Sequence, residues 1–329
     1  MSTPEPRPLL SLRDVHIGWR RRGEVREIVR GVDLDVLPGE KVGVVGESGS
    51  GKTLTMLSVL RLLPRPLEVL SGQMTFEDRD LSGLDDRGME SIRGAGVAMV
   101  YQDPMTSLNP LLRVRTQVIE TLRSHGASDA AARRRTREVL AQVGFVDPGR
   151  VEASFPHELS GGMVQRVMIA MAIATAPRLL VADEPTTALD VTIQQQILDL
   201  VDSLQAGTSM SVVWVSHDLG VIARLVDRVC VMYAGRIVEN APTLRLFAQP
   251  AHPYSHALLG SLPGPEVEHR ARLTQIGGSP PDPTQLPPGC PFRPRCPFAF
   301  ERCAIEEPPL LDRGKESFAA CWKEPSAWS

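Results

Sequence analysis

The stretch KVGVVGESGSGKT, residues 41–53, decides the fold of this chain. Its first five residues are mainly valine and predict a short buried strand. The glycines that follow predict a tight turn, because glycine accepts backbone angles that other residues avoid. Residues 54–63 are rich in leucine and contain neither proline nor glycine, which predicts a helix that ends before Pro64. A buried strand, a glycine turn and a helix in this order predict an α/β architecture.

The glycine turn has the spacing of a phosphate-binding loop, Gly46-x-x-x-x-Gly51-Lys52-Thr53. Glycines allow backbone N–H groups to point inward at phosphate oxygens, and the helix that follows adds the positive end of its dipole. In such a loop Lys52 reaches the β- and γ-phosphates, and the Thr53 hydroxyl binds Mg²⁺. The pattern therefore predicts that the chain binds a nucleoside triphosphate.

Two further apolar stretches end in side chains that suit phosphate chemistry. The first, RLLVADEP (178–185), reads as a central parallel strand followed by Asp183 and Glu184. Adjacent carboxylates repel unless a cation or separate tasks keep both ionised, so we assign Mg²⁺ to Asp183 and the attacking water to Glu184. The second, SVVWVSHD (211–218), ends in His217, which is either a turn residue or a phosphate contact. Ligands of open α/β sheets bind at this edge.

Composition and charge exclude other classes of function. A formal net charge of −3 gives no electrostatic case for nucleic-acid binding. The N-terminal residues contain no apolar run of signal-peptide length, and the most apolar stretch, residues 167–177, is too short to span a membrane. We therefore expect a cytosolic protein, in which thiols stay reduced.

A second glycine corner lies in HELSGGMVQR, residues 157–166. Ser160, Gly161 and Gly162 can form a backbone nest that opens a helix at Met163, which is an anion site in its own right. Two phosphate-binding corners far apart in sequence can serve one nucleotide, or two nucleotides shared between two chains. A plain turn is the alternative.

Six ordered motifs give the chain a resemblance to the nucleotide-binding subunits of ABC transporters. GESGSGKT resembles the Walker A motif, LLVADE the Walker B motif, LSGGM the signature motif and VSHD the switch-histidine region. TTALD (186–190) resembles the D-loop, and Gln102 matches the Q-loop. Trp19 lies where the family places an aromatic ring on adenine. Order and spacing match from about residue 9 to residue 247.

Longer stretches narrow the resemblance to the ATPases of oligopeptide and dipeptide importers, and among these to the D-type subunit. They are GESGSGKTLTMLSVLRLLP, YQDPMTSLNP, FPHELSGGMVQRVMIAMAI and ADEPTTALDVT, followed by QPAHPYSHALLGSLP (249–263) and a Cys-rich segment. One departure from the general pattern is Met163, where many signature motifs carry glutamine.

The resemblance implies a fold and a division of the chain. The implied fold class is α/β, a P-loop NTPase (RecA-like) core with an antiparallel β region and a helical subdomain, plus a small Cys-rich C-terminal extension. The nucleotide-binding domain would span residues 9–250, with the helical subdomain at about 104–170. Residues 251–329 would form a C-terminal region of the oligopeptide-transporter type.

The resemblance also assigns roles to residues. Glu184 and His217 would be catalytic, and Thr53, Gln102 and Asp183 would hold Mg²⁺. Ser160, Gly161 and Gly162, with Asp190 of the D-loop, would serve the nucleotide held by a partner chain. The implied contacts to ATP are made by Trp19, Gly46, Glu47, Ser48, Gly49, Ser50, Gly51, Lys52, Thr53, Thr55 and Gln102.

The implied partners are a second ABC ATPase subunit, two integral membrane permease subunits and an extracellular or periplasmic solute-binding protein, with no nucleic acid. The chain would lie peripherally on the cytoplasmic face of the cell membrane. Two other functions stay open: the ATPase of an importer for nickel or another small solute, and a soluble ABC ATPase outside transport.

Four of the five cysteines lie in the tail: Cys290, Cys296, Cys303 and Cys321. Their wide, Pro-punctuated spacing differs from the C-x2-4-C start of most structural zinc sites and suits a [4Fe–4S] cluster. Some members of the resembling subfamily bind such a cluster in this region. We therefore expect a cluster that holds together a tail rich in Pro and Gly, with zinc or no metal as alternatives. Cys230 is expected to be a buried thiol without chemistry.

Overall fold

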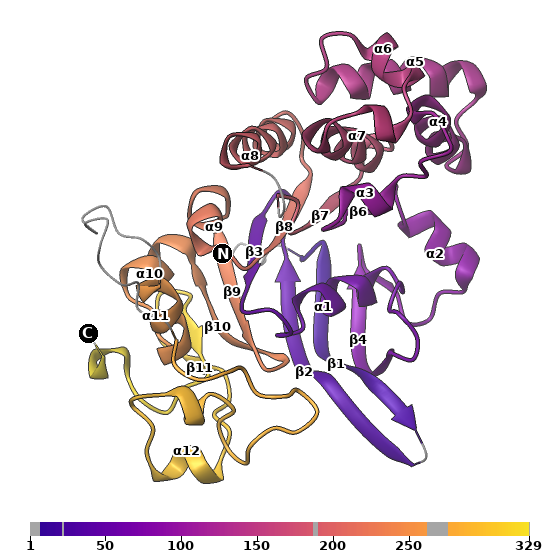
Figure 1. The fold of residues 1–329 in the computed structure, drawn as a ribbon. Coiled ribbons are helices and arrows are strands. Elements are labelled where there is room, and N and C mark those ends of the chain that lie inside the picture. The colour runs from indigo at the N-terminus through magenta and orange to yellow at the C-terminus, as the bar shows by residue number, and fades with distance from the viewer. Residues whose placement is uncertain (1–6, 22, 187–189, 262–275, 329) are drawn as a thin grey trace, which may run out of the picture. The chain divides into compact units, whose positions relative to one another are not determined.

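A computed structural model describes residues 7–21, 23–186, 190–261 and 276–328 of the protein (Figure 1). The chain divides into two compact units. The first unit contains Leu37–Glu40 and Gly83–Trp214. The second unit contains Arg7–Val36, Lys41–Ser82 and the residues from Val215 onward.

The second unit begins with an antiparallel sheet in the strand order β2-β1-β4-β5. Its strands are β1 (Leu10–Arg21), β2 (Glu24–Val36), β4 (Glu68–Phe76) and β5 (Arg79–Asp80). β1 lies between two partners, so that Leu10 stands opposite Val36 on one side and Phe76 on the other. These three side chains are fully buried, and the sheet contacts the helix α1 (Lys52–Val59).

The same unit holds a second set of strands in the order β11-β12-β10-β9-β3. They are β3 (Lys41–Val45), β9 (Arg228–Tyr233), β10 (Arg236–Pro242), β11 (Leu311–Asp312) and β12 (Phe318–Ala319). β3 and β9 pair in parallel, with Val42 opposite Arg228, whereas β9, β10, β12 and β11 pair antiparallel. The valines of β3 are buried, and Cys230 is a buried thiol in β9, as the sequence predicted.

The helix that follows β3, α1 (Lys52–Val59), is shorter than predicted. Arg61 adopts a left-handed φ of 50°, and the N–H of Leu62 bonds back to the carbonyl of Leu57 at 2.9 Å. The Arg61 guanidinium also donates to the carbonyl of Leu81 beyond β5. Because this distant contact fixes the turn, the helix stops before the predicted end.

The C-terminal segment, residues 276–328, is joined to the rest of the second unit by contacts of its own. β12 pairs with β10, and the carboxylate of Glu307 binds Arg30 at 3.0 Å and Arg236 at 3.3 Å. The indole N–H of Trp328 donates to the carbonyl of Pro250 at 3.2 Å. Short helices of this unit are α9 (Leu219–Leu225), α10 (Thr243–Ala248), α11 (Pro253–Gly260) and α12 (Glu301–Ile305), with 3-10 turns at Arg293–Arg295 and Pro325–Ala327.

A buried carboxylate connects β10 to α11. Glu239 is fully buried and accepts hydrogen bonds from the N–H groups of Ala251 at 2.7 Å and His252 at 2.8 Å. Burial raises the pKa of Glu239 to about 7, although these donors act in the opposite direction. The two bonds fix the N-terminal end of α11 on the strand.

The first unit contains the strands β8, β7 and β6, which neighbour one another in that order. They are β6 (Val97–Val100), β7 (Leu179–Asp183) and β8 (Ser211–Ser216), and the last two residues of β8 belong to the second unit. β6 and β7 pair in parallel, with Val97 opposite Leu179. Every residue of β6 and β7 is buried, as expected for parallel strands that are covered on both faces.

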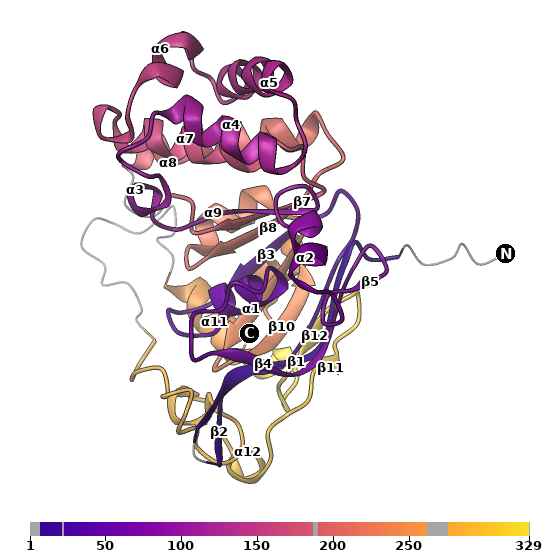
Figure 2. The same cartoon turned by 90° about the vertical axis from the view of Figure 1, so that its right-hand side faces the viewer.

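The helices of the first unit include a group, α4 to α7, in which neighbouring members contact one another (Figure 2). The helices are α2 (Asp86–Ile92), α3 (Pro104–Ser107), α4 (Val114–Ser124), α5 (Asp129–Gln142), α6 (Pro148–Ala153), α7 (Gly161–Ile173) and α8 (Val191–Ala206), with a 3-10 turn at Pro156–Glu158. No helix in the described part of the chain is both long and apolar enough to cross a membrane.

The helix α5, from Asp129 to Gln142, is rich in arginine. Its arginines do not all form a solvated face. Arg137 is exposed and pairs with Glu152 at 3.1 Å, whereas Arg135 donates to the carbonyls of Ile173 and Ala174. Arg135 thus donates hydrogen bonds at the C-terminal end of α7, where the last carbonyls of a helix have no N–H partner within the helix.

The α/β class and the antiparallel region near the start of the chain are confirmed. The domain boundaries at residues 9–250, 104–170 and 251–329 stay predictions, as does a separate Cys-rich extension.

Candidate functional site

The predicted phosphate loop lies in the second unit between β3 and α1. Gly51 caps α1 with a left-handed φ of 103°, an angle that L side chains rarely adopt. At Gly46 a Cβ atom would come within 2.2 Å of the carbonyl oxygen of Met232 on β9. Glycine is therefore required at both ends of the loop, at one end by the backbone angle and at the other by a neighbouring strand.

Lys52 is folded back over this loop. Its side chain is buried, and its ammonium donates to the carbonyls of Gly46 at 2.7 Å and Glu47 at 3.0 Å. In the described part of the chain, the buried hydroxyl of Ser50 has no hydrogen-bond partner. A lysine and an orphan hydroxyl at the N-terminal end of a helix make a fitting cradle for a phosphate group.

The other residues expected to contact ATP in this unit differ in exposure. Ser48 and Gly49 are exposed, and Thr53 is half-buried in the first turn of α1. The Thr55 hydroxyl is buried and donates to the carbonyl of Gly51 at 2.9 Å, which supports the turn. Trp19 is half-buried on β1. Their contacts to a nucleotide stay predictions.

The carboxylates and the glutamine of the predicted site lie in the first unit. Asp183 is buried at the end of β7, and Glu184 follows with a left-handed φ of 46°. Such an angle is uncommon for a residue other than glycine, asparagine or aspartate, and it clusters at functional sites. The amide of Gln102 donates to the Glu184 carboxylate at 3.1 Å. The structure thus joins Gln102 and Glu184 across two predicted motifs.

The second glycine corner opens α7. Ser160 is its exposed N-cap, and its hydroxyl accepts from the N–H of Met163 at 3.4 Å. A Cβ at Gly162 would meet the side chain of Ile193 at 2.8 Å. Asp190, the N-cap of α8, accepts from the N–H of that same Ile193 at 2.9 Å. Gly162 of this corner and Asp190 therefore both lie against Ile193.

The D-loop and the switch-histidine region are the two remaining predicted motifs. Residues 187–189 of TTALD lie outside the described residues. His217 belongs to the second unit and is exposed after β8, while Asp218 caps α9 by accepting from the N–H of Gly220 at 2.8 Å. The predicted role of His217 stays a prediction.

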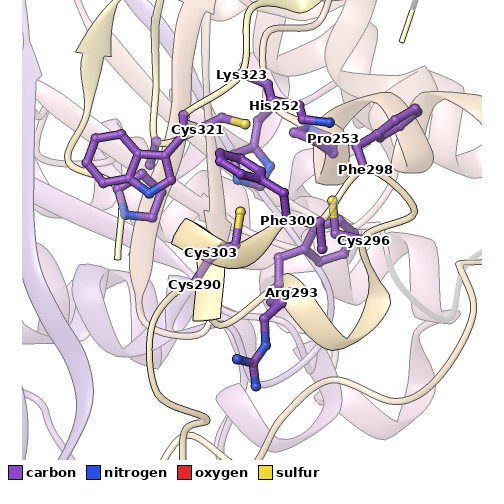
Figure 3. Close-up of a pocket in the computed structure, with 15 residues that line it drawn as sticks. His252, Pro253, Cys290, Arg293, Cys296, Phe298, Phe300, Cys303, Cys321 and Lys323 are labelled. Atoms are coloured by element: carbon purple, nitrogen blue, oxygen red, sulfur yellow. The ribbon is translucent and has the colours of Figure 1, made fainter. Parts of the chain in front are cut away.

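The expected iron–sulfur cluster was wrong. Over residues 7–21, 23–186, 190–261 and 276–328, no group of three or more His, Cys, Asp and Glu side chains is placed to hold a metal ion. The four tail cysteines are free thiols that line one pocket together with Phe298, Phe300 and Trp322 (Figure 3). The predictions of iron–sulfur and metal binding for Cys290, Cys296, Cys303 and Cys321 are therefore withdrawn.

The tail thiols lie in a partly buried setting. Burial raises the pKa of Cys290 to about 11, and burial also raises the pKa of Cys296 and Cys321, so these side chains are protonated thiols at neutral pH. The tail is held instead by the strand pairing and the ion pairs described above.

Sequence reasoning missed two residues that contact the phosphate loop. The hydroxyl of Tyr254 on α11 accepts from the N–H of Glu47 at 2.8 Å. The guanidinium of Arg295 binds the Glu47 carboxylate with two bonds of 2.6 and 2.9 Å. Neither residue belongs to a phosphate-binding motif, and Arg295 lies 248 positions from Glu47, so no local pattern could have revealed the contact.

Comparisons with known proteins cover nearly the whole chain. The sequence matches the family described as "ABC transporter" over residues 29–187 and the one described as "Oligopeptide/dipeptide transporter, C-terminal region" over residues 238–303. The Dipeptide transport ATP-binding protein DppD of Bacillus subtilis is 45% identical over 316 residues, which cover 95% of this chain and 94% of the relative. The Probable peptide ABC transporter ATP-binding protein y4tR of Sinorhizobium fredii is 45% identical over 324 residues, which cover 98% and 97%.

A solved structure is similar as well. It is described as the dimeric, post-hydrolysis state of the ATP-binding cassette MJ0796 bound to ADP and Pi. Its sequence is 27% identical to this chain, and the TM-score is 0.63. The likeness covers 71% of this chain and 98% of the solved chain.

Proposed function

Because this chain belongs to the family of ABC transporter ATP-binding subunits, in the oligopeptide and dipeptide branch, we propose that it binds and hydrolyses ATP to power the import of peptides. Its fold is that of an ABC ATPase cassette. The family predicted from the motifs is confirmed.

One observation carries the proposal for this chain's own site, namely the glycine loop that opens α1. Gly51 leaves the first N–H groups of α1 without a side-chain cap, and Lys52 lies buried against the same loop. The orphan hydroxyl of Ser50 adds a donor. These groups fit the β- and γ-phosphates of ATP, which need several N–H donors and a fixed cation.

Hydrolysis needs a group that orients the attacking water. Glu184 takes this role, and the amide of Gln102, which donates to its carboxylate, holds the side chain in place. Mg²⁺ neutralises phosphate charge when it is bound with the nucleotide. The oxygens of Thr53, Gln102 and Asp183 are ligands of the type that Mg²⁺ prefers, and we assign the ion to them. His217 contacts the γ-phosphate.

The Ser160 corner serves a second chain. It is exposed and already capped by its own hydroxyl, so it offers half of an anion site and not a closed pocket. We assign Ser160, Gly161 and Gly162 to the nucleotide of a partner ATPase subunit, which we expect to be an unlike chain, with Asp190 beside them. The assembly would include two membrane permeases and an external solute-binding protein, with this chain on the cytoplasmic face of the membrane.

Two substitutions test the proposal. Glu184→Gln should lower ATP turnover roughly 100- to 10,000-fold while nucleotide still binds, because only the general base is lost. Lys52→Ala should abolish binding of the Mg²⁺ complex of ATP in calorimetry. ATP turnover by Glu184→Gln at the rate of the unmodified chain would refute the assigned role.

Transport is tested with the assembled importer. Uptake of a radiolabelled dipeptide into vesicles that contain the permeases, the binding protein and both ATPases should require ATP and an intact Glu184. Uptake of nickel with no uptake of dipeptide would favour the alternative importer. ATPase activity with no permease interaction would favour a role outside transport.

A further inference from the structure

The phosphate loop is held by contacts from the C-terminal part of the chain. Glu47, the second residue of the loop, is the residue that this part binds. Its N–H donates to the Tyr254 hydroxyl at 2.8 Å, and its carboxylate accepts two bonds from Arg295 at 2.6 and 2.9 Å. A bidentate guanidinium–carboxylate pair fixes orientation as well as distance.

The environment of this pair differs from that of a surface ion pair. The Arg295 side chain is 3% exposed and that of Glu47 is 26% exposed. Arg295 also donates to the carbonyl of Gly277 at 2.9 Å, so its guanidinium is fixed by the tail and by the loop at once. Screening by solvent is therefore weak, and the pair contributes more than an exposed one.

An aromatic group supports both contacts. Phe292 lies with its ring centre 5.2 Å from Tyr233 and 5.4 Å from Tyr254, and the two tyrosine rings are 4.6 Å apart. Phe292 and Tyr254 are fully buried. Because Phe292 precedes Arg295 by three residues, the anchored ring positions the arginine at the loop.

Charge gives the contact a consequence for nucleotide binding. A loop that receives the triphosphate carries a carboxylate one residue after its first glycine, and like charges at such short range repel. Arg295 neutralises that carboxylate. The carbonyls of Gly46 and Glu47, which hold the Lys52 ammonium, belong to the same segment, so fixing Glu47 also fixes the position of the lysine.

We propose that Arg295 and Tyr254 are positioning residues through which the C-terminal region keeps the phosphate loop neutral at Glu47 and shaped for ATP. This inference rests on the proposed function of the loop. It assigns a part of nucleotide affinity to a region that lies outside every nucleotide-binding motif of the chain.

A charge-matched double variant tests it on the full-length chain. The measurement is the dissociation constant for the non-hydrolysable analogue AMP-PNP with Mg²⁺, by calorimetry. Arg295→Met should raise this constant about tenfold, because the Glu47 charge is no longer compensated. In the double variant Arg295→Met with Glu47→Gln the uncompensated carboxylate is gone, so the constant should return to within about threefold of the unmodified chain.

Arg313→Met is the matched control. Arg313 is an arginine of the same tail with a side chain 5% exposed, and it pairs with Glu324 and donates to the carbonyl of Cys321 instead of binding Glu47. Its loss should lower the melting temperature as Arg295→Met does, with AMP-PNP affinity unchanged. Equal loss of affinity in both variants would overturn the inference, since general loosening of the tail would then be the cause.

Four other results separate the possibilities. Unchanged affinity in Arg295→Met overturns the inference and leaves the proposed function intact. Weak binding that Glu47→Gln does not restore also overturns it. Two results would defeat both the proposed function and the inference. In one, the unmodified chain binds no AMP-PNP. In the other, the Lys52→Ala variant binds AMP-PNP as tightly as the unmodified chain.

Discussion

Two glycine corners of this molecule open helices, and they are built in opposite ways. At α1 the cap is Gly51, left-handed and without a side-chain hydrogen bond, beside a buried lysine. At α7 the cap is Ser160, extended, exposed and bonded by its own hydroxyl to the N–H of Met163. At the first corner the cap residue has no side chain that could bond the N–H groups after it, whereas the second satisfies part of its own need and faces outward.

The difference supports the proposal that the α1 corner serves this chain's own nucleotide and the α7 corner that of a partner. The α1 corner is supported by a strand at Gly46 and by the C-terminal region at Glu47, so its shape does not depend on a partner. The α7 corner has a neighbour at Ile193 and no lysine in its loop. We therefore expect it to stabilise phosphate charge only when a partner chain brings that charge to it.

The largest of the effects that distinguish the two corners is expected from a substitution at Ser160 that keeps its helix-capping role and removes its role in anion binding. Ser160→Asp keeps a good N-cap but places a negative charge where we assign the partner's γ-phosphate. ATP turnover of the assembled transporter should fall about 100-fold, comparable to the loss of one preorganised donor. The binding of AMP-PNP to the isolated chain should not change.

Ser160→Ala is the matched control for that charge, because it removes the cap without adding a carboxylate. It should cost about 1 kcal/mol of stability and reduce turnover less than the aspartate does. Full turnover by the aspartate variant would mean that the two corners never share a nucleotide.

A smaller effect, on stability, should distinguish Gly51 from Gly162, because of these two only Gly51 has a left-handed backbone angle. Gly51→Ala forces a side chain into φ 103° and should cost about 1 to 2 kcal/mol of unfolding free energy. Gly162→Ala would meet the Cγ2 methyl of Ile193 at 2.8 Å but adds no backbone strain, so the loss should be smaller if this side chain shifts. Urea unfolding of both variants measures the difference, and equal losses would show that the α1 corner is not the strained one.

The smallest effect is expected from the loss of the hydrogen bond between Tyr254 on α11 and the α1 corner. Tyr254→Phe removes the acceptor of the Glu47 N–H and should lower the unfolding free energy by about 1 kcal/mol. Burial raises the pKa of Tyr254, so its hydroxyl stays protonated and the effect should not depend on pH between 6 and about 9. A strong pH dependence in that range would contradict the assigned contact.

The sequence predicted those parts of the molecule that a few adjacent residues determine. The glycines, Lys52 and the valine strand before them fix the phosphate loop, and the run LLVAD fixes a buried strand. The end of α1 was missed because Arg61 turns the chain through a contact with Leu81. Local spacing carries no information about such a contact.

The tail shows the same limit more strongly. Four cysteines at plausible intervals favoured a metal cluster, but intervals do not say where thiols point or what surrounds them. The contact of Arg295 with Glu47 was invisible for the same reason. Both features depend on contacts between residues 276–328 and positions far earlier in the chain, and such contacts leave no local pattern in the sequence.

The buried carboxylate of Glu239 has a practical consequence for anyone who shortens this protein. It receives its two backbone donors from Ala251 and His252, so a gene fragment that stops at residue 250 would leave an acid without partners inside the strand layer. The same cut removes Tyr254. An expression boundary drawn where the nucleotide motifs end would therefore yield a damaged fragment, and the smallest useful recombinant piece must include α11.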